Sequence, residues 1–215
     1  MKKKVLVTGF DPFGNDTVNP ALEAVKQLDG IFIDEVEIVT QEVPTVFHDS
    51  INVMIKAIET HQPDVVICVG QAGGRTQVTP ERIAINVDDA RIPDNKKNQP
   101  IDEQIYEDGP AAYWTTLPVK LIVRHMKKAG VPAAVSNTAG TFVCNHLFYG
   151  LMHYIQKSAP HIRGGFIHIP YIPEQTLENG APSLSLDDIV KGLKTAAIVA
   201  AYEKEDIQEI GGTTH

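Results

Sequence analysis

The feature that most constrains the fold is an alternation of short, β-branched apolar runs with longer segments of helical periodicity. The apolar runs have the length and composition of buried strands, and they are residues 5–8, 36–39, 65–69, 133–135 and 165–169. Helical patterns occupy residues 21–28, 45–61, 117–129, 144–157 and 186–203. Strands that alternate with helices pair in parallel, and helices then cover both faces of the sheet. The sequence therefore predicts an α/β fold, a three-layer α/β/α sandwich around a mainly parallel (mixed) twisted sheet.

Length and composition fit one folded domain of this class. The 215 residues include 43% hydrophobic and 21% charged residues, which is an ordinary balance for a globular protein. No internal repeat or domain linker interrupts the chain, so we expect a single domain over residues 1–215. The formal net charge of −8 opposes binding to nucleic acid, because that binding depends on clustered lysine and arginine side chains.

The N-terminal segment lacks the features of a targeting sequence. Lysines at residues 2–4 precede an apolar stretch that covers only residues 5–7. A secretion signal has an apolar core of about 7–15 residues, and no window of the chain approaches the ~18 apolar residues of a membrane span. We therefore expect a cytoplasmic protein with no membrane partner. The two cysteines, Cys68 and Cys144, should remain thiols in that reducing compartment.

The loops that follow the predicted strands are the places where a binding site is expected. In open α/β sheets, ligands bind beside the carboxyl ends of the strands. The segments in that position are residues 9–14, 70–79, 136–142 and 168–171. Residues 88–110 are polar and contain Pro93 and Pro100, which predicts a long loop or hairpin. Loops of this length are often functional.

The two cysteines lie in different sequence environments. Cys68 lies within Val-Val-Ile-Cys-Val-Gly and is predicted to be a buried apolar residue of a strand. Cys144 follows a turn of small residues and falls in the first turn of a predicted helix. Unpaired N–H groups and the positive end of the helix dipole favour a thiolate there. Cys144 is therefore a candidate nucleophile, and a thiol that only packs against the sheet is the alternative.

A nucleophilic cysteine needs a base and a third group that orients the base. Among the eight histidines, His168 ends an apolar strand at the edge where ligands bind, whereas His146 is too close to Cys144 along one helix. A hydrogen-bonded core histidine is the alternative for His168. Glu81 leads into an apolar segment after a glycine-rich loop, and a buried carboxylate must be paired. It is a candidate for orienting the base, with an ordinary salt bridge as the alternative.

Two other classes of function have weaker support. Glycine-rich turns at residues 9–14 and 70–74 suggest nucleotide binding. Neither turn contains the Gly-Lys-Ser/Thr of a phosphate loop or the spacing of a dinucleotide fingerprint. A metal-dependent hydrolase would need an HExxH-type pair or a Cys/His cluster with zinc spacing, and the sequence contains neither. We therefore expect no cofactor and no bound metal.

Five segments form an ordered set of motifs. They are TGFDPFG at residues 8–14, GQAG…VTPERIAIN over residues 70–86, DARIPD at residues 89–94, SNTAGTFVCNH at residues 136–146 and FIHIPYIP at residues 166–173. This set resembles the pyroglutamyl-peptidase I family, also called pyrrolidone carboxyl peptidase, of the bacterial type. The resemblance extends from residue 4 to about residue 190. Asn15 stands where members of the family often have glycine, and residues 30–35 are variable, but no expected catalytic position departs from the pattern.

The resemblance implies a cysteine exopeptidase that releases pyroglutamate from the N-terminus of peptides and proteins through a thioester. In that enzyme Cys144 would be the nucleophile, His168 the base and Glu81 the group that orients His168. The implied partners are peptides with an N-terminal pyroglutamyl residue. Members of the family tend to form dimers or tetramers, so the resemblance also implies a homo-oligomer, with a homotetramer as one form.

Pyroglutamate is a flat, neutral lactam, so its pocket requires apolar walls and a few hydrogen-bonding groups. By resemblance, Phe10 and Phe13 sandwich the ring and the main chain of Gln71 meets the lactam. We expect the backbone N–H groups at the helix start, together with Arg91, to hold the oxyanion. The remaining residues of the predicted pocket are Thr45, Ile92, Phe142 and Val143.

Overall fold

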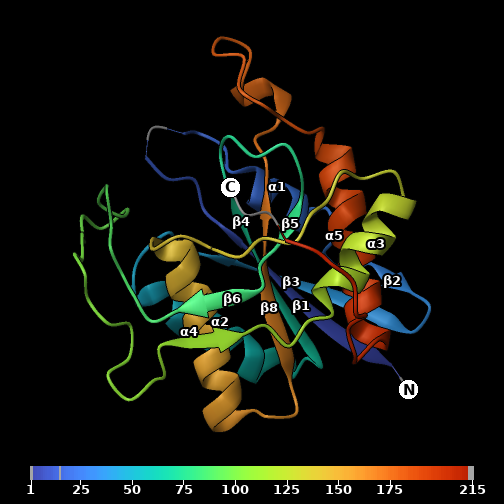
Figure 1. The fold of residues 1–215 in the computed structure, drawn as a ribbon, viewed down its shortest axis with the longest axis horizontal. Helices are drawn as coiled ribbons and strands as arrows, with labels where there is room; N and C mark the ends of the chain where they lie inside the picture. The colour runs from blue at the N-terminus through green and yellow to red at the C-terminus, as the bar shows by residue number, and fades with distance from the viewer. Residues whose placement is uncertain (1, 15, 213–215) are drawn as a thin grey trace.

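The computed structural model describes residues 2–14 and 16–212, so Asn15 lies outside the described residues. Within them, a central sheet contains six strands in the order β2-β3-β1-β4-β8-β5 (Figure 1). The parallel strands are β1 (Lys3–Phe10), β3 (Val36–Val43), β4 (Val65–Gln71) and β8 (Arg163–Ile169). The antiparallel edge strands are β2 (Phe32–Ile33) and β5 (Thr79–Pro80). A separate antiparallel pair joins β6 (Ile83–Ile85) to β7 (Ala112–Trp114).

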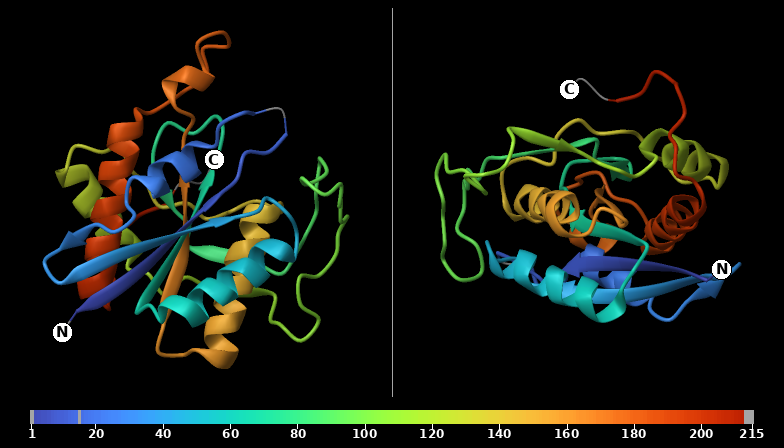
Figure 2. Two further views of the ribbon diagram at one scale, coloured as in Figure 1. Left: turned by 180° about the vertical axis from the view of Figure 1, so that it is seen from behind. Right: turned by 90° about the horizontal axis from the view of Figure 1, so that it is seen from below.

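Helices cover both faces of the sheet, as the two views in Figure 2 show. One face is covered by α1 (Pro20–Lys26), α3 (Val119–Lys128) and α5 (Leu186–Tyr202). The other face is covered by α2 (Asp49–His61) and α4 (Val143–Ser158). A short 3₁₀ helix, η1 (Pro173–Gln175), follows β8. The predicted α/β/α sandwich around a mainly parallel, mixed sheet is therefore confirmed.

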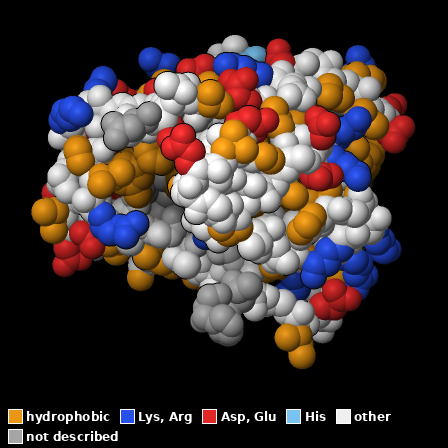
Figure 3. All heavy atoms as spheres, turned by 90° about the horizontal axis from the view of Figure 1, so that it is seen from above, with side chains coloured by type: hydrophobic (Ala, Val, Ile, Leu, Met, Phe, Trp, Pro, Cys, Tyr) orange, Lys and Arg blue, Asp and Glu red, His pale blue; other side chains and the backbone are white. Residues whose placement is uncertain are grey.

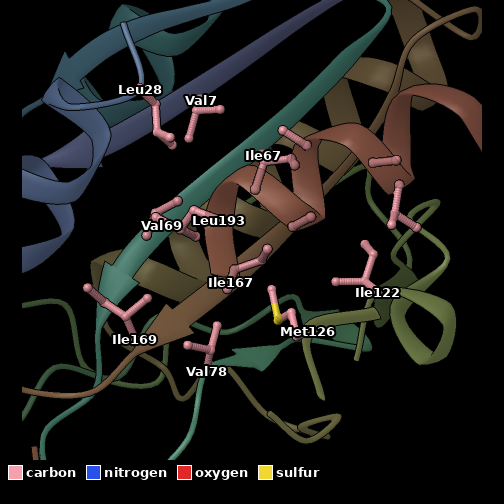
Figure 4. Close-up of a cluster of buried hydrophobic side chains, with 14 of the residues drawn as sticks. Val7, Leu28, Ile67, Val69, Val78, Ile122, Met126, Ile167, Ile169 and Leu193 are labelled. Carbon is pink, nitrogen blue, oxygen red and sulfur yellow. The ribbon is translucent and has the colours of Figure 1, made fainter. Parts of the chain in front are cut away.

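Strand periodicity divides the core into two apolar layers, because successive side chains of a strand point to opposite faces. In β1, Val5 and Val7 face the α1–α3–α5 layer, whereas Leu6 faces the α2–α4 layer. Figure 4 shows the first layer, in which Val69 of β4 and Leu193 of α5 lie close together. Since both faces are buried, the four parallel strands form a rigid base for the loops at their carboxyl ends.

The starts of the helices follow from capping. The Asn19 side chain accepts a hydrogen bond from the N–H of Ala21, and Pro20 occupies the first helical position of α1. Helix α4 differs, because its N-cap residue Phe142 makes no side-chain capping hydrogen bond. The first N–H groups of α4 therefore receive no side-chain acceptor from the cap.

Several predicted boundaries are wrong. Residues 133–135 form no strand, and Ala133 makes only an isolated bridge to Val78. The helix predicted from residue 45 begins at Asp49, because His48 has a φ of 61° that an α-helix cannot contain. Strands β2, β5, β6 and β7 were not predicted, since segments of two or three residues carry no periodicity. Residues 88–110 are a long loop as predicted, with one isolated bridge between Asp88 and Glu103.

None of the helices in the described part of the chain combines the length and the hydropathy needed to cross a membrane.

Candidate active site

A cavity of about 450 Å³ opens at the carboxyl ends of the parallel strands. Its volume lies within the range of small-molecule sites. Cys144 and His168 both line it. It is also lined by most of the predicted pocket residues, namely Phe10, Phe13, Thr45, Gln71, Arg91, Ile92 and Phe142. Figure 3 views the molecule from above and shows acidic, basic and hydrophobic side chains side by side on that face.

The cysteine lies at the start of α4, over the end of β4. Cys144 is the second residue of the helix and is partly exposed, and the turn before it contains Gly140 with a φ of 76°. Gly70 of β4 leaves room for the sulfur, because a Cβ there would lie 2.9 Å from Cys144 Sγ. Gly70 pairs in register with His168 of β8. Adjacent strands are only about 4.8 Å apart, so the sulfur lies above a residue that neighbours His168.

The histidine is held by a buried carboxylate. His168 Nδ1 lies 2.7 Å from Glu81 Oε1, and Glu81 is fully buried. Strand β5 folds back antiparallel on β8 and pairs Thr79 with His168. This pairing brings Glu81 against β8, where its N–H donates to the carbonyl of Phe166. A carboxylate at Nδ1 fixes the tautomer in which Nε2 of the imidazole can accept a proton.

A guanidinium cation contacts the same carboxylate oxygen as His168. Arg75 Nη1 lies 2.6 Å from Glu81 Oε1 and also donates to Thr79 Oγ1. Arg75 Nη2 donates to the carbonyl of Thr138, in the turn that precedes Cys144. Glu81 therefore accepts charge-assisted hydrogen bonds from two sides.

Burial and the neighbouring groups keep the carboxylate ionised and the imidazole neutral. Burial acts to raise the pKa of Glu81, but the hydrogen bond from His168 and the charge of Arg75 outweigh it, so the pKa lies below its ordinary value. Burial lowers the pKa of His168, and Glu81 only partly opposes that effect. His168 is thus an unprotonated base near neutral pH.

The thiol does not behave as the helix position predicted. Burial raises the pKa of Cys144 to about 12, with Glu81 adding to the rise and Arg75 opposing it. Burial and the charge of Glu81 thus act against the thiolate that the helix position predicted. Among the described residues, no hydrogen bond joins the thiol to His168. The site therefore holds a neutral thiol near a neutral base, and a reaction would require proton transfer between them.

Aromatic side chains form the apolar wall of the cavity. The rings of Phe13 and Phe142 are tilted with centroids 6.3 Å apart, and Phe47 packs its edge against Phe142 at 5.5 Å. Phe10 is almost fully buried and contacts Phe166, with ring centroids 6.4 Å apart, so it is part of the core as well as of the cavity wall.

A second buried imidazole–carboxylate pair connects segments that line the cavity. His146 Nδ1 lies 2.7 Å from Asp88 Oδ2, and His146 Nε2 accepts the N–H of His48 at 2.8 Å. These contacts tie α4 to the segments that carry Thr45 and Asp89. The structural role predicted for His146 is confirmed.

Cys68, predicted as a buried strand residue, is fully buried in β4.

The structure differs from the predicted pocket in a few residues. Val143 is fully buried in the core and is not among the residues that line the cavity. Lining residues that were not predicted are Asn19, Asp89, Ala139, Gly140 and Thr141. Asp89 and the turn before Cys144 lie within recognised motifs, so the motifs themselves carried a signal for them. Asn19 was recognised only as a helix cap.

Within residues 2–14 and 16–212, no cluster of three or more His, Cys, Asp and Glu side chains could hold a metal ion.

A thiol at a helix start, beside an imidazole that a carboxylate orients, is the arrangement that defines the cysteine-type hydrolases. Comparisons with known proteins identify the family within this class. The family model described as pyroglutamyl peptidase matches residues 3–204. The chain belongs to the pyroglutamyl peptidase family, and it is a peptidase of the cysteine type.

Similar proteins share the whole chain. The pyrrolidone-carboxylate peptidase of Bacillus amyloliquefaciens is 65% identical over 215 residues, covering 100% of both chains. The same-named protein of Bacillus subtilis (strain 168) is 62% identical over 215 residues, again covering 100% of both. The crystal structure of pyroglutamyl peptidase I from Bacillus amyloliquefaciens superposes with a TM-score of 0.96 at 65% identity, covering 97% of this chain and 100% of that one. The structure of a mutant pyrrolidone carboxyl peptidase of the hyperthermophile Pyrococcus furiosus superposes with a TM-score of 0.89 at 41% identity, covering 92% of this chain and 97% of that one.

Proposed function

We propose that this peptidase hydrolyses the bond after an N-terminal pyroglutamyl residue, with Cys144 as nucleophile, His168 as base and Glu81 as the group that orients His168. The observation that carries the proposal is the placement of Cys144 Sγ above Gly70, in register with an imidazole hydrogen-bonded to a fully buried carboxylate. Cys144 and His168 line one apolar-walled cavity of a size that suits a small ring.

The proposed reaction begins with proton transfer. His168 Nε2 takes the proton of the Cys144 thiol as the sulfur attacks the pyroglutamyl carbonyl carbon, and the carbonyl oxygen becomes an oxyanion. The oxyanion collapses, the C–N bond breaks, and His168 returns the proton to the departing amine. Water then attacks the thioester, with His168 as base, and releases pyroglutamate and the thiol. Glu81 stabilises the imidazolium that forms in both steps.

Two features support stabilisation of the oxyanion. The first N–H groups of α4 have no side-chain acceptor from the cap, and a helix N-terminus favours negative charge. Arg91 also lines the cavity and can add a positive charge from its rim.

Recognition of the lactam is proposed to rest on the aromatic wall and on Gln71. Phe13 and Phe142 present tilted rings to the cavity, and Phe10 lines it from the core side. The side chain of Gln71 is held by Gln175, whose Nε2 donates to Gln71 Oε1 at 2.9 Å. This hydrogen bond supports a fixed position for Gln71 beside the ring.

The test compares matched substrates and two cysteine variants. The wild-type protein should release the aminocoumarin from a pyroglutamyl-coumarylamide and leave the prolyl and glutamyl analogues intact. Cys144→Ala should abolish turnover with an unchanged far-UV circular dichroism spectrum, whereas Cys68→Ala, in the buried strand position, should retain it. Equal turnover of the three substrates, or an active Cys144→Ala variant, would refute the proposal.

Three further properties are proposed, of which only the oligomer rests on the family resemblance and the other two rest on the sequence pattern. We expect one catalytic domain over residues 1–215, a homo-oligomer of two or four chains, and a cytoplasmic location. Sedimentation equilibrium tests the oligomer, and a monomer at micromolar concentration would contradict it. Limited proteolysis tests the single domain, and separation into stable fragments would contradict it. Cell fractionation tests the location, and recovery outside the cytoplasm would contradict it.

A further inference from the structure

We infer that Arg75 is a positioning residue of the Cys144–His168–Glu81 triad, which locks Glu81 in place and ties it to the turn that carries the cysteine. The inference deepens the proposed function and rests on it. It starts from the charge pattern of the site, in which one fully buried carboxylate is paired with both an imidazole and a guanidinium.

The geometry of the guanidinium links both sides of the site. Nη1 donates to Glu81 Oε1 and to Thr79 Oγ1, and Nη2 donates to the carbonyl of Thr138 at 3.1 Å. Glu81 and Thr79 belong to the side that holds the base, because Thr79 pairs with His168 across β5 and β8. Thr138 belongs to the turn before Cys144. A planar guanidinium fixes the direction of each of these hydrogen bonds, which a lysine ammonium cannot do.

The contact with Glu81 restricts the carboxylate that orients the base. Glu81 Oε1 lies 2.6 Å from Arg75 Nη1 and 2.7 Å from His168 Nδ1. Rotation of the carboxylate away from His168 would break both charge-assisted hydrogen bonds in a buried environment, where each is worth more than at the surface. Arg75 thereby holds His168 in the orientation that proton transfer requires.

The turn before Cys144 is positioned by the same side chain. Thr138 is also bonded to Ser136, whose Oγ donates to the Thr138 carbonyl at 3.1 Å. Arg75 connects this turn to Glu81 through one side chain, in addition to the backbone bridge between Glu81 and Ser136. Displacement of Arg75 would therefore loosen the placement of the nucleophile relative to the base, and errors of about 1 Å in such placement cost on the order of 10²-fold in rate.

The charge of Arg75 also lowers the pKa of all three side chains of the triad. The groups that face the thiol are Glu81 and Cys68, which raise its pKa, and Arg75, which lowers it. The groups that face His168 are Glu81, which raises its pKa, and Arg75, which lowers it. Arg75 also helps to lower the pKa of Glu81. Its charge thus favours an ionised carboxylate, a neutral base and an easier loss of the thiol proton.

The neighbouring Arg82 provides a matched control. It lies next to Glu81 in the sequence, but its guanidinium donates to the carbonyl of Gly211 in the C-terminal segment instead of to the site. Removal of Arg82 changes the net charge as much as removal of Arg75 does, without touching the triad.

The experiment compares Arg75→Met, Arg75→Lys and Arg82→Met with the wild type. The readouts are kcat, KM, the pH profile of kcat/KM, and the pH dependence of Cys144 alkylation by iodoacetamide, followed by mass spectrometry. Arg75→Met should lower kcat roughly 10- to 100-fold with KM within about twofold of the wild type. Its Cys144 should be alkylated about tenfold more slowly at each pH between 7 and 9, because the charge of Arg75 that opposes the raised thiol pKa is lost. Arg82→Met should match the wild type in every readout.

Arg75→Lys keeps the charge but not the forked geometry, so it should keep the wild-type alkylation rate at each pH and still lose kcat about tenfold. It serves as the second test if Arg75→Met does not fold. The inference is overturned if Arg75→Met lowers only the unfolding midpoint while both pH profiles superpose on those of the wild type, or if Arg75→Lys keeps the wild-type kcat. Wild-type protein that stays active after full alkylation of Cys144 would instead refute the proposed function.

Discussion

Substitution of Gly70 by alanine tests the geometry of the nucleophile most locally. A Cβ at this position would lie 2.9 Å from Cys144 Sγ and 2.8 Å from Phe166 Cζ. Nonbonded atoms of this kind are at their optimum at about 3.5–4.0 Å, so the sulfur or the ring must move by roughly 1 Å. Such overpacking costs about 1–3 kcal/mol of stability. A 1 Å displacement of the nucleophile should lower kcat/KM on the order of 10²-fold, which is about 2.7 kcal/mol in the activation free energy.

The matched control for Gly70→Ala is Gly164→Ala. A Cβ at Gly164 of β8 would lie 2.7 Å from Ile155 Cδ1 and 3.0 Å from Leu151 Cδ2, away from the cavity. Both variants should unfold at lower denaturant concentration than the wild type. Only Gly70→Ala should lose activity toward a pyroglutamyl-coumarylamide. If Gly70→Ala keeps the wild-type kcat/KM, the sulfur does not lie over Gly70 during the reaction and the reasoning fails.

The remaining predictions concern the base, the pocket and the response to acid. Glu81→Gln should lower kcat about 10²- to 10⁴-fold with a smaller change in KM, because the imidazolium loses its anionic partner; steady-state kinetics that match the wild type would contradict this role. Phe13→Ala should raise KM more than it lowers kcat, since it removes one apolar wall, and an unchanged KM would exclude the ring from the pocket. The lowered pKa of His168 predicts that stability falls as pH drops below about 6.5, where the unfolded imidazole binds a proton that the buried one does not. Urea unfolding between pH 7 and 5 should therefore show a steeper loss for the wild type than for His168→Gln, and equal slopes would contradict the prediction.

The lowered pKa of Glu81 acts in a separate window. Its stabilisation is complete above the ordinary glutamate pKa of 4.5 and is lost as the pH falls through the depressed folded-state pKa. The two effects have the same sign, so both favour the folded state at neutral pH relative to acid.

Much of the fold could be predicted, because long buried strands and amphipathic helices leave a periodic signal. Strands β1, β3, β4 and β8 were recognised from β-branched runs, and each of the five helices was recognised from its apolar spacing. The edge strand β5 was not recognised from the sequence, although it places Glu81 beside His168. A strand of two residues is too short to show an apolar period, and its pairing depends on β8, which lies far along the chain.

The site shows the same division between local pattern and tertiary context. Cys144 and His168 could be singled out because Cys144 falls at the start of a predicted helix and His168 ends a strand at the edge where ligands bind. Arg75 could not, since its role depends on hydrogen bonds to Glu81 and Thr138 that only the folded chain forms, and Thr138 lies 63 residues further along the sequence. The direction of the thiol pKa was also beyond reach, because a helix start is visible in the sequence whereas burial is a property of the folded chain.

The most direct test of the account is to trap the covalent intermediate. Enzyme mixed with a pyroglutamyl-coumarylamide and quenched in acid within one turnover should carry one acyl group, and peptide mapping by mass spectrometry should place it on the peptide that contains Cys144. The account predicts a mass increase equal to a single pyroglutamyl group at that residue, absent in Cys144→Ala. An acyl group on a different side chain, or turnover without any acylated protein under conditions where the thioester accumulates, would contradict it.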